Sequence, residues 1–173
     1  MSHSAPLKVL IAPHPLLKAR AAPVTSVDNG LRRLMDDMLQ AMYLAPGIGL
    51  AAPQVGVSKR IVVIDLANDK QARAPLRLVN PQITWRSEEK AMLEEGCLSL
   101  PDQFAEVLRP TAVRVAYTDE HGTEQKIEGA GMLGRCLQHE IDHLDGILFV
   151  DHISSLKRNI IMRRLAKQMR LKS

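Results

Sequence analysis

The stretch QHEIDHLDG, residues 138–146, constrains the fold more than any other part of the sequence. His139 and His143 are four residues apart, and on a helix such positions share one face, with about 5–6 Å between Cβ atoms. Both imidazoles would then reach one metal ion, with Glu140 beside them as a general base. The pattern therefore predicts a helix that carries a metallohydrolase site. A helix with two surface histidines gives the same short pattern, so the rest of the sequence has to decide.

Hydrophobic periodicity predicts three helices and a set of antiparallel strands. The helices are expected at about 26–44, 131–144 and 154–170. The strands are expected at 60–66, at 76–85 and, as a hairpin, at 112–129. Ser26 is the expected N-cap of the first helix, Gly146 follows the second, and the strand at 76–85 is either broken or at a sheet edge near Pro81. The predicted fold class is α+β, with antiparallel strands packed around the central metal-binding helix and with an N-terminal and a C-terminal helix.

The composition suits one globular domain over residues 1–173. Hydrophobic residues make up 46% and charged residues 24%, and no apolar run approaches the roughly 18 residues of a membrane span. The first residues lack a charged segment followed by a long apolar one, so no signal peptide is expected. The two cysteines, Cys97 and Cys136, are too few for a disulfide framework. We therefore expect a cytoplasmic location, where thiols stay reduced.

A metal site needs a third ligand, and the sequence offers one upstream of the histidines. No third histidine follows HEIDH a turn later, whereas EEGCLSLP, residues 94–101, contains Cys97. Gly96 permits unusual backbone angles and Pro101 disfavours strand pairing, so we expect a loop that presents the thiol and backbone N–H groups. One cysteine and two histidines make a tetrahedral site with an open position for water. The alternative is a buried cysteine that acts as a small hydrophobe.

A third stretch, GIGLAAPQVG at residues 47–56, can also contribute to the chemistry. Its glycines and prolines argue against a regular element, and glycines let a backbone approach a ligand closely. The side-chain amide of Gln54 can donate a hydrogen bond to a developing oxyanion. An ordinary tight turn explains the same residues, so this stretch by itself is a weak indication.

Together, GIGLAAPQVG, EGCLSLP and QHEIDHLDG resemble, in this order and spacing, the three signature motifs of the peptide deformylase family. The likeness runs from VTSVDNGL to HLDGILFVDHI, which is nearly the whole chain. It implies that Cys97, His139 and His143 bind a divalent metal, with water in the fourth position. The implied ion is Fe²⁺, and Zn²⁺ or Ni²⁺ can occupy the same site. The ligand set alone favours zinc.

The resemblance implies removal of the N-formyl group from formyl-methionine at the N-terminus of newly made polypeptides, with release of formate. Water activated by the metal would attack the formyl carbon. The metal, the Gln54 amide and the Leu98 backbone N–H would hold the oxyanion. Glu140 would take the proton of the water and pass it to the departing amine.

The resemblance also implies where the substrate binds. The Ile48–Gly49 and Gly96–Leu98 segments would pair with an extended peptide. By family position, the pocket for the methionine side chain would include Ile48, Leu93, Met132, Arg135 and Cys136. A solvated Arg135 whose stem packs on the pocket wall is the alternative to direct substrate contact. Phe104 stands where many relatives carry arginine near the substrate backbone, which leaves the affinity for the rest of the peptide open.

The C-terminal segment, 154–173, is predicted to be a basic helix. Residues 156–173 contain seven lysines and arginines and no acid, although the net charge of the whole chain is only +4. One face of the helix would be apolar, formed by Leu156, Ile160, Ile161, Leu165 and Met169. The helix is expected to dock on the domain, and the resemblance suggests that it also contacts ribosomal RNA. Neither DNA nor a membrane is indicated as a partner.

Two other classes of function fit the sequence less well. An HExxH metalloprotease usually takes its third ligand downstream as His or Glu, whereas the apparent third ligand here is the upstream Cys97. A ribosome-binding or metal-holding relative without turnover is disfavoured because Glu140 and Gln54 are both present.

Overall fold

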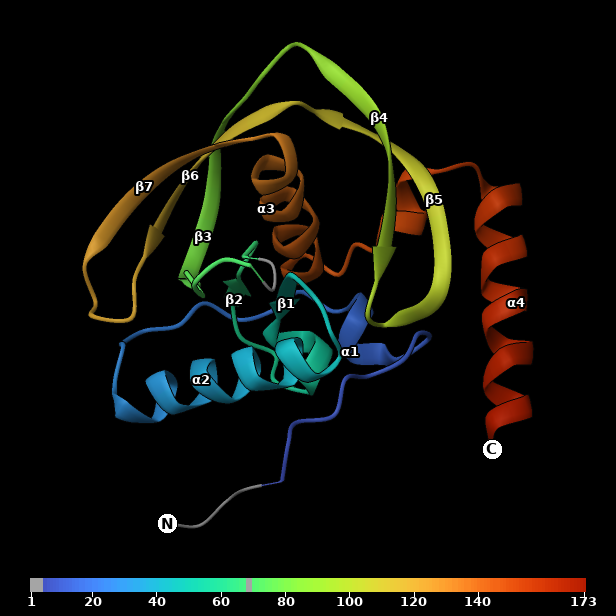
Figure 1. Cartoon of the computed structure of the whole chain (residues 1–173), viewed down its shortest axis with the longest axis horizontal. Coiled ribbons are helices and arrows are strands. Elements are labelled where there is room, and N and C mark those ends of the chain that lie inside the picture. Colours follow the sequence, from blue (N-terminus) through green and yellow to red (C-terminus); the bar gives the residue numbers. More distant parts are fainter. Residues whose placement is uncertain (1–4, 68–69) are drawn as a thin grey trace.

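The computed structural model describes residues 5–67 and 70–173 (Figure 1). Within them are seven strands, the last six of which follow one another without an intervening helix. The strands are β1 (Gly49–Ala51), β2 (Ile61–Ile64), β3 (Leu76–Arg86), β4 (Lys90–Cys97), β5 (Leu100–Pro110), β6 (Ala112–Thr118) and β7 (Glu124–Ala130). The α-helices are α1 (Pro15–Lys18), α2 (Asn29–Leu44), α3 (Gly131–Leu144) and α4 (Ser155–Lys172). The 3₁₀-helices are η1 (Ala52–Val55) and η2 (Phe149–His152).

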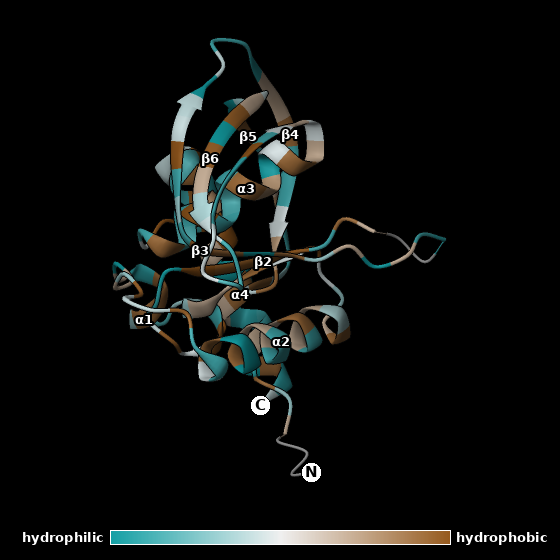
Figure 2. Cartoon of the chain, turned by 90° about the vertical axis from the view of Figure 1, so that its left-hand side faces the viewer, coloured by the Kyte–Doolittle hydropathy of each residue, from teal (hydrophilic) through white to brown (hydrophobic). Residues whose placement is uncertain are grey.

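The strands form a five-stranded antiparallel sheet, in the order β1-β2-β3-β6-β7, and a separate two-stranded sheet of β4 and β5. Strand β2 is buried on both faces, because Val62 and Ile64 pack with α3 while Ile61 and Val63 pack with α2. Figure 2 shows the resulting hydrophobic band at β2, across the middle of the molecule. The predicted α+β class, with antiparallel strands around a central helix, is confirmed.

Strand β3 lies inside the sheet, between β2 and β6, so the alternative of an edge strand near Pro81 is wrong. The strand is broken instead. Its register against β6 shifts between Val79 and Gln82, and Asn80 has a φ of 50°. The Asn80 side chain accepts a hydrogen bond from the Val24 N–H and donates one to the Val24 carbonyl, each at 2.8 Å. Pro81, which has no N–H to donate, thus lies where the ladder is interrupted.

The central helix has the predicted bounds, but the N-cap of α2 differs from the prediction. Helix α3 spans Gly131–Leu144, and Gly146 follows it with a φ of 73°. The N-cap of α2 is Asp28, whose side chain accepts from the Leu31 N–H at 2.8 Å. Asp28 satisfies one of the free N–H groups of the first turn, so Ser26 stays outside the helix and its predicted capping role is wrong.

The largest departure from prediction is the segment around Cys97, which is the tip of a β-hairpin and not a loop. The register of β4 against β5 runs from Lys90↔Pro110 to Gly96↔Phe104 and, after a shift, ends at Cys97↔Leu100. Pro101 disfavours pairing less than expected because it lies near the start of its strand, where a missing N–H is tolerated. The GIGLAAPQVG stretch also contains regular structure, because β1 pairs with β2 and η1 carries Gln54.

Helix α3 approaches β7 closely because two glycines meet there. A Cβ on Gly134 would lie 2.6 Å from the carbonyl oxygen of Gly129, and one on Gly129 would lie 2.7 Å from Cδ1 of Leu137. Real side chains do not come this close, so glycine at both positions allows the helix to sit deep on the sheet. The later turns of α3, which carry His139 and His143, then face the hairpin (Figure 1).

Helix α4 docks through a shorter apolar face than predicted. Ile161 and Leu165 are buried in a cluster with η2 and β5, whereas Leu156 is 72% exposed and Ile160 is 41% exposed. The predicted apolar face is therefore wrong at Leu156 and Ile160, in the first two turns of the helix. Among the residues that the structure describes, no helix, α4 included, is both long and apolar enough to span a membrane.

Candidate metal centre

Three side chains from two separate elements converge on one point. Sγ of Cys97 and one ring nitrogen each of His139 and His143 lie within 4.8 Å of one another. Sγ of Cys97 is 3.4 Å from Nε2 of His143, and the two imidazole rings meet edge to face with their centroids 5.1 Å apart. Helix α3 supplies both histidines from one face, and the end of β4 supplies the thiol. The structure thus brings together the three side chains that the sequence singled out as ligands.

The chemistry of these donors fits a divalent metal ion. Nδ1 of His139 donates to Oε1 of Glu95 at 2.9 Å, which leaves Nε2 as the nitrogen that faces the site. A carboxylate on the far nitrogen is the usual support of a metal-binding histidine, because it fixes the ring and makes the other nitrogen more basic. The ring of Phe149, which is fully buried, stacks on His139 with centroids 6.3 Å apart. The ring of His139 is therefore held in place from two sides.

Glu140 lies beside the three candidate ligands without joining them. It is only 4% exposed, and its Oε1 is 3.7 Å from Nε2 of His139. Its Oε2 has no hydrogen-bond partner in the described part of the chain. Burial raises the pKa of Glu140 to about 7. A carboxyl group that changes protonation near neutral pH, with one oxygen unengaged, suits a general base that later acts as an acid.

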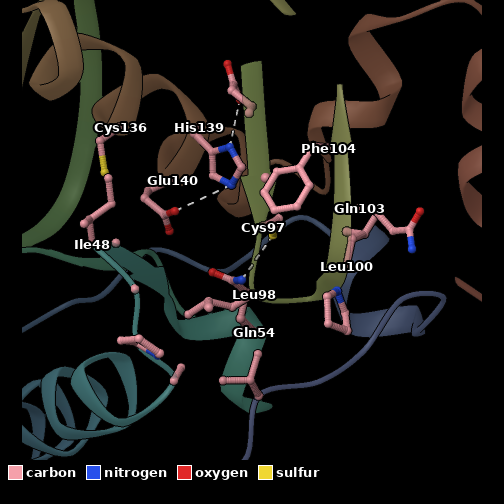
Figure 3. Close-up of a pocket in the computed structure, with 18 of the residues that line it drawn as sticks. Ile48, Gln54, Cys97, Leu98, Leu100, Gln103, Phe104, Cys136, His139 and Glu140 are labelled. Atoms are coloured by element: carbon pink, nitrogen blue, oxygen red, sulfur yellow. Dashed lines mark hydrogen bonds and ion pairs between the residues drawn. The ribbon is translucent and has the colours of Figure 1, made fainter. Parts of the chain in front are cut away.

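Gln54 faces the site from η1, and its neighbours fix the orientation of its amide. Oε1 accepts from the Ala51 N–H at 2.9 Å, while Nε2 donates to Oγ of Ser99 at 3.1 Å and lies 3.5 Å from Sγ of Cys97. Because the carbonyl end is occupied by Ala51, the N–H end is the one that points to Cys97 (Figure 3). A donor to an oxyanion needs this orientation. Leu98, the other predicted donor, follows Cys97 at the hairpin tip.

Behind the candidate ligands lies a buried charge network that the sequence analysis missed. Glu95 accepts from Nε of Arg109 at 2.6 Å and from the guanidinium of Arg135 at 2.6 Å, in addition to His139. Arg109 also donates to Asp142 at 2.8 Å. Burial acts to raise the pKa of Glu95, but the hydrogen bonds from His139 and Arg109 outweigh it and hold that pKa well below its usual value. Glu95 therefore stays ionised behind His139.

A signal for Glu95 was present in the sequence. Residues two apart in a strand point to the same side, and Glu95 comes two residues before Cys97. The loop predicted at 94–101 would have no such alternation, so Glu95 was not predicted to lie near the site. Arg109 carried no comparable signal, because its partner is 14 residues away and the pairing depends on the hairpin register.

The side chain of Arg135 is not solvated, so the alternative weighed for it is wrong. It is 8% exposed and donates to Glu95, to the Val107 carbonyl at 3.0 Å and to the Ala91 carbonyl at 2.9 Å. Arg135 lines the pocket, but its guanidinium is bound to the hairpin. We infer that Arg135 chiefly ties the hairpin to α3.

Replacing Arg135 with methionine is expected to lower the free energy of unfolding by about 1–3 kcal/mol, because Glu95 loses one of its buried charged donors and two carbonyls lose theirs. The effect should stay in this range because Arg109 still neutralises Glu95 and His139 still donates a hydrogen bond to it. Urea denaturation followed by circular dichroism measures it. The matched control is Arg86→Met, at an exposed position of β3, which should change the free energy by less than about 0.5 kcal/mol. Equal values for the two variants would contradict a stabilising role for Arg135.

Two of the candidate ligands, Cys97 and His139, line a pocket of about 600 Å³ (Figure 3). Most of the predicted substrate-binding residues line it, namely Ile48, Gly49, Gly96, Met132, Arg135 and Cys136. Leu93 does not line it, and its side chain is half exposed. A Cβ on Gly49 would lie 2.8 Å from Sγ of Cys136 and 2.9 Å from Cγ of Glu140. Glycine at position 49 therefore lets strand β1 lie directly against the helix that carries Glu140.

Comparison with known proteins gives consistent matches over most of the chain. The family model described as "Polypeptide deformylase" matches residues 6–159. The peptide deformylase of Rhizobium meliloti is 52% identical over 159 residues, which cover 92% of this chain and 91% of that protein. The crystal structure of a peptide deformylase from Legionella pneumophila is 45% identical, with a TM-score of 0.91 over 97% of this chain and 98% of that one. The crystal structure of the Ehrlichia chaffeensis peptide deformylase in complex with actinonin is 39% identical, with a TM-score of 0.90 over 95% of this chain and 98% of that one.

Proposed function

Because this chain belongs to the polypeptide deformylase family, it removes the N-formyl group from newly made polypeptides, and we propose that it does so at Cys97, His139 and His143. The observation that carries this assignment is the convergence of these three ligand atoms within 4.8 Å, with the unengaged Glu140 carboxylate beside them. The enzyme is a metal-dependent hydrolase of this family. We propose that residues 1–173 act as one catalytic domain, and that it works in the cytoplasm, where formylated chains are made.

The proposed ion is Fe²⁺, with Zn²⁺ or Ni²⁺ as ions that the same donors accept. Cys97, His139 and His143 would hold it, and the thiolate would distinguish this site from the carboxylate-containing sites of most HExxH hydrolases. Once bound, a divalent ion supplies Lewis acidity, which lowers the pKa of water and polarises the formyl carbonyl. The Glu95 carboxylate would keep His139 in the tautomer that presents Nε2 to the ion.

The residues of the chain would supply the remaining chemistry. Glu140, ionised at neutral pH once a cation is nearby, would take a proton from the attacking water and deliver it to the departing amine. The Gln54 amide would donate to the oxygen of the formyl group as negative charge develops there, and the Leu98 backbone N–H would donate to the same atom. The hydrogen bond from Ala51 to Gln54 fixes this donor in advance, so its amide needs no reorientation during the reaction.

The substrate would lie between β1 and the end of β4. The backbone of Ile48–Gly49 on one side and of Gly96–Leu98 on the other would pair with the extended peptide. The methionine side chain would enter the apolar end of the pocket, beside Ile48, Met132 and Cys136. Burial raises the pKa of the Cys136 thiol well above its usual value, so at neutral pH this residue stays an uncharged wall of that pocket.

The experiment that tests this function is formate release by anaerobically purified, iron-loaded protein. Formyl-Met-Ala-Ser should release formate, and its peptide bonds should stay intact. The unformylated peptide Met-Ala-Ser serves as the matched substrate and should be unchanged. Cleavage of a peptide bond in either substrate would favour a metalloprotease instead. Failure to release formate while metal is bound would contradict the proposed function.

We also propose that α4 contacts ribosomal RNA near the exit of the nascent chain. The helix is anchored by Ile161 and Leu165 on the body of the protein, which leaves its basic side chains on the outer surface. In Figure 1, α4 stands at the edge of the molecule beside β5. A basic helix exposed along its length suits contact with phosphates, and such a contact would place the enzyme where formylated chains emerge.

Changing the exposed basic residues of α4 to glutamate should abolish binding to ribosomes while turnover of a small formyl-peptide remains. Suitable positions are Arg163, Arg164, Lys167 and Arg170, all exposed. Cosedimentation at low and moderate salt measures binding, which for the parent should fall by roughly one log–log slope unit per phosphate contacted. Equal binding of parent and variant, or binding indifferent to salt, would reduce α4 to a structural helix.

A further inference from the structure

The side chain of Gln168, on helix α4, forms hydrogen bonds with the wall of the active-site pocket. Its Nε2 donates to Oδ2 of Asp102 at 2.9 Å, and its Oε1 accepts from Nε2 of Gln103 at 3.0 Å. Asp102 and Gln103 both line the pocket that contains the candidate metal centre. A single amide thus joins the C-terminal helix to two consecutive residues of the site, and it uses both of its ends to do so.

The segment that Gln168 holds has few other constraints. Asp102 is exposed and has a φ of 62°, a left-handed conformation that a residue other than glycine adopts at some cost. Phe104 is 60% exposed at the pocket rim, and its ring occupies the space above Gly96, where a Cβ would lie 2.6 Å from Cε1. The position of these residues therefore depends on the hairpin register and on the two hydrogen bonds from α4.

The position of Gln168 is set by buried residues of the same helix. It lies three residues after Leu165, which is fully buried, and Ile161 anchors the preceding turn. Positions three and four apart share a helix face, so the side that docks α4 on the body also directs Gln168 to the hairpin. The docked helix α4 thus holds the Gln168 amide in place, and the amide in turn positions the less constrained start of β5.

The pocket has two walls on either side of the candidate metal ligands. In Figure 3, Ile48 and Cys136 lie on one side of Cys97, and Gln103 and Phe104 lie on the other. The proposed function gives the first wall to the methionine side chain. The second wall is then the part of the pocket that remains for the residues that follow methionine.

We propose that Gln168 is a positioning residue for the substrate, which holds the Asp102–Phe104 wall where it contacts the peptide beyond its formyl-methionine. The inference rests on the proposed function, because it presumes a formylated peptide in this pocket. It assigns to α4 a part in substrate affinity in addition to any contact with the ribosome. The hydrogen bonds of Gln168 are with Asp102 and Gln103 and not with the candidate metal ligands or Glu140, so we expect the chemical step to stay unchanged.

The test uses a charge change and its compensation. Gln168→Glu keeps the acceptor for Gln103 but sets two carboxylates against each other at Asp102. Adding Asp102→Asn restores a donor to the new carboxylate, and asparagine tolerates the left-handed conformation of position 102. The matched control is Asn159→Asp, which makes the same amide-to-carboxylate change at an exposed position of the same helix.

Kinetics of the iron-loaded proteins, measured anaerobically by formate release, separate affinity from chemistry. For formyl-Met-Ala-Ser, Gln168→Glu should raise KM about three- to tenfold, as expected for the loss of one hydrogen bond and a new repulsion, with kcat within about twofold of the parent. For formyl-methionine, which lacks the later residues, KM should stay unchanged. The double variant should recover to the KM of Asp102→Asn alone, because position 102 is then again joined to residue 168. Asn159→Asp should behave like the parent protein.

Several outcomes would overturn this inference. They are an unchanged KM for the longer substrate, an equal rise for both substrates, a fall confined to kcat, or a double variant that fails to recover. An equal rise for both substrates would mean that Gln168 supports the fold of the site in general. A parent protein that binds iron but releases no formate from either substrate would overturn the proposed function, and this inference with it.

Discussion

Cys97→Ser should leave the protein folded but nearly free of metal, with a loss of activity of more than about 100-fold. Loss of a mere partner of a metal ligand typically costs about 10- to 100-fold, and loss of a ligand should cost more. A serine hydroxyl stays protonated at neutral pH and is a poor ligand for a divalent ion, whereas a thiol near a metal gives up its proton. Metal content by elemental analysis and formate release, measured on the same preparation, test the prediction.

The same exchange at the other cysteine is the matched control for Cys97. Cys136 lines the pocket but lies outside the group of candidate ligands, so Cys136→Ser should keep its metal. Peroxide should inactivate the parent through the Cys97 thiolate, and a thiol reductant should protect it. Burial raises the pKa of Cys136 well above its usual value, so removing that thiol should not protect the enzyme. Full metal content and full rate in Cys97→Ser would refute the Cys/His₂ site.

Glu140→Ala should reduce turnover by about 10²- to 10⁴-fold while the protein keeps its metal, because general acid–base catalysis contributes about that much. The informative result is a variant that keeps its metal but loses its turnover. It follows from the position of Glu140, whose Oε2 has no partner among the described residues and whose Oε1 is 3.7 Å from Nε2 of His139. A metal-free variant would make Glu140 a ligand or a structural support, and its role as acid and base would be wrong.

Glu140→Gln supplies a control of the same shape, and it should lose turnover to a similar extent. Without metal, Glu140→Gln should also be more stable than the parent protein above neutral pH. Burial raises the pKa of Glu140 from 4.5 to about 7, so the folded parent binds more protons than the unfolded chain between these values. The stabilisation from the protonated acid is present below pH 4.5 and is lost as pH rises through about 7. Glutamine does not titrate, so denaturation of the variant should lack this pH dependence.

The sequence predicted which side chains would converge better than it predicted the elements that hold them together. The spacing of His139 and His143 depends only on helical geometry, and a helix that begins at Gly131 has that geometry wherever it packs. The β4–β5 hairpin was harder to foresee, because Gly96 and Pro101 are local signals for irregular structure and the pairing that overrides them is tertiary. For the same reason the charge network around Glu95 was missed, since its arginines come from β5 and α3.

The capping error at α2 has a similarly local cause. Ser26 and Asp28 are both good N-cap residues, and sequence preference cannot separate two candidates that lie two residues apart. The link from Gln168 to Asp102 is the opposite case, because it joins residues 66 positions apart through side chains that carry no motif. Contacts of that kind depend on how α4 docks, which its apolar residues indicate only in part.

The pairing of β4 with β5 depends on the number of residues at the hairpin tip as well as on their identity. Only Leu98 and Ser99 separate Cys97 from Leu100, and side chains alternate along each strand. One residue inserted at this tip would slide β5 by one step and turn Arg109 away from Glu95, because a one-residue slip exchanges the two faces of a strand. Insertions and deletions at this tip should therefore be selected against far more strongly than in the turn between β6 and β7, where no candidate site residue lies.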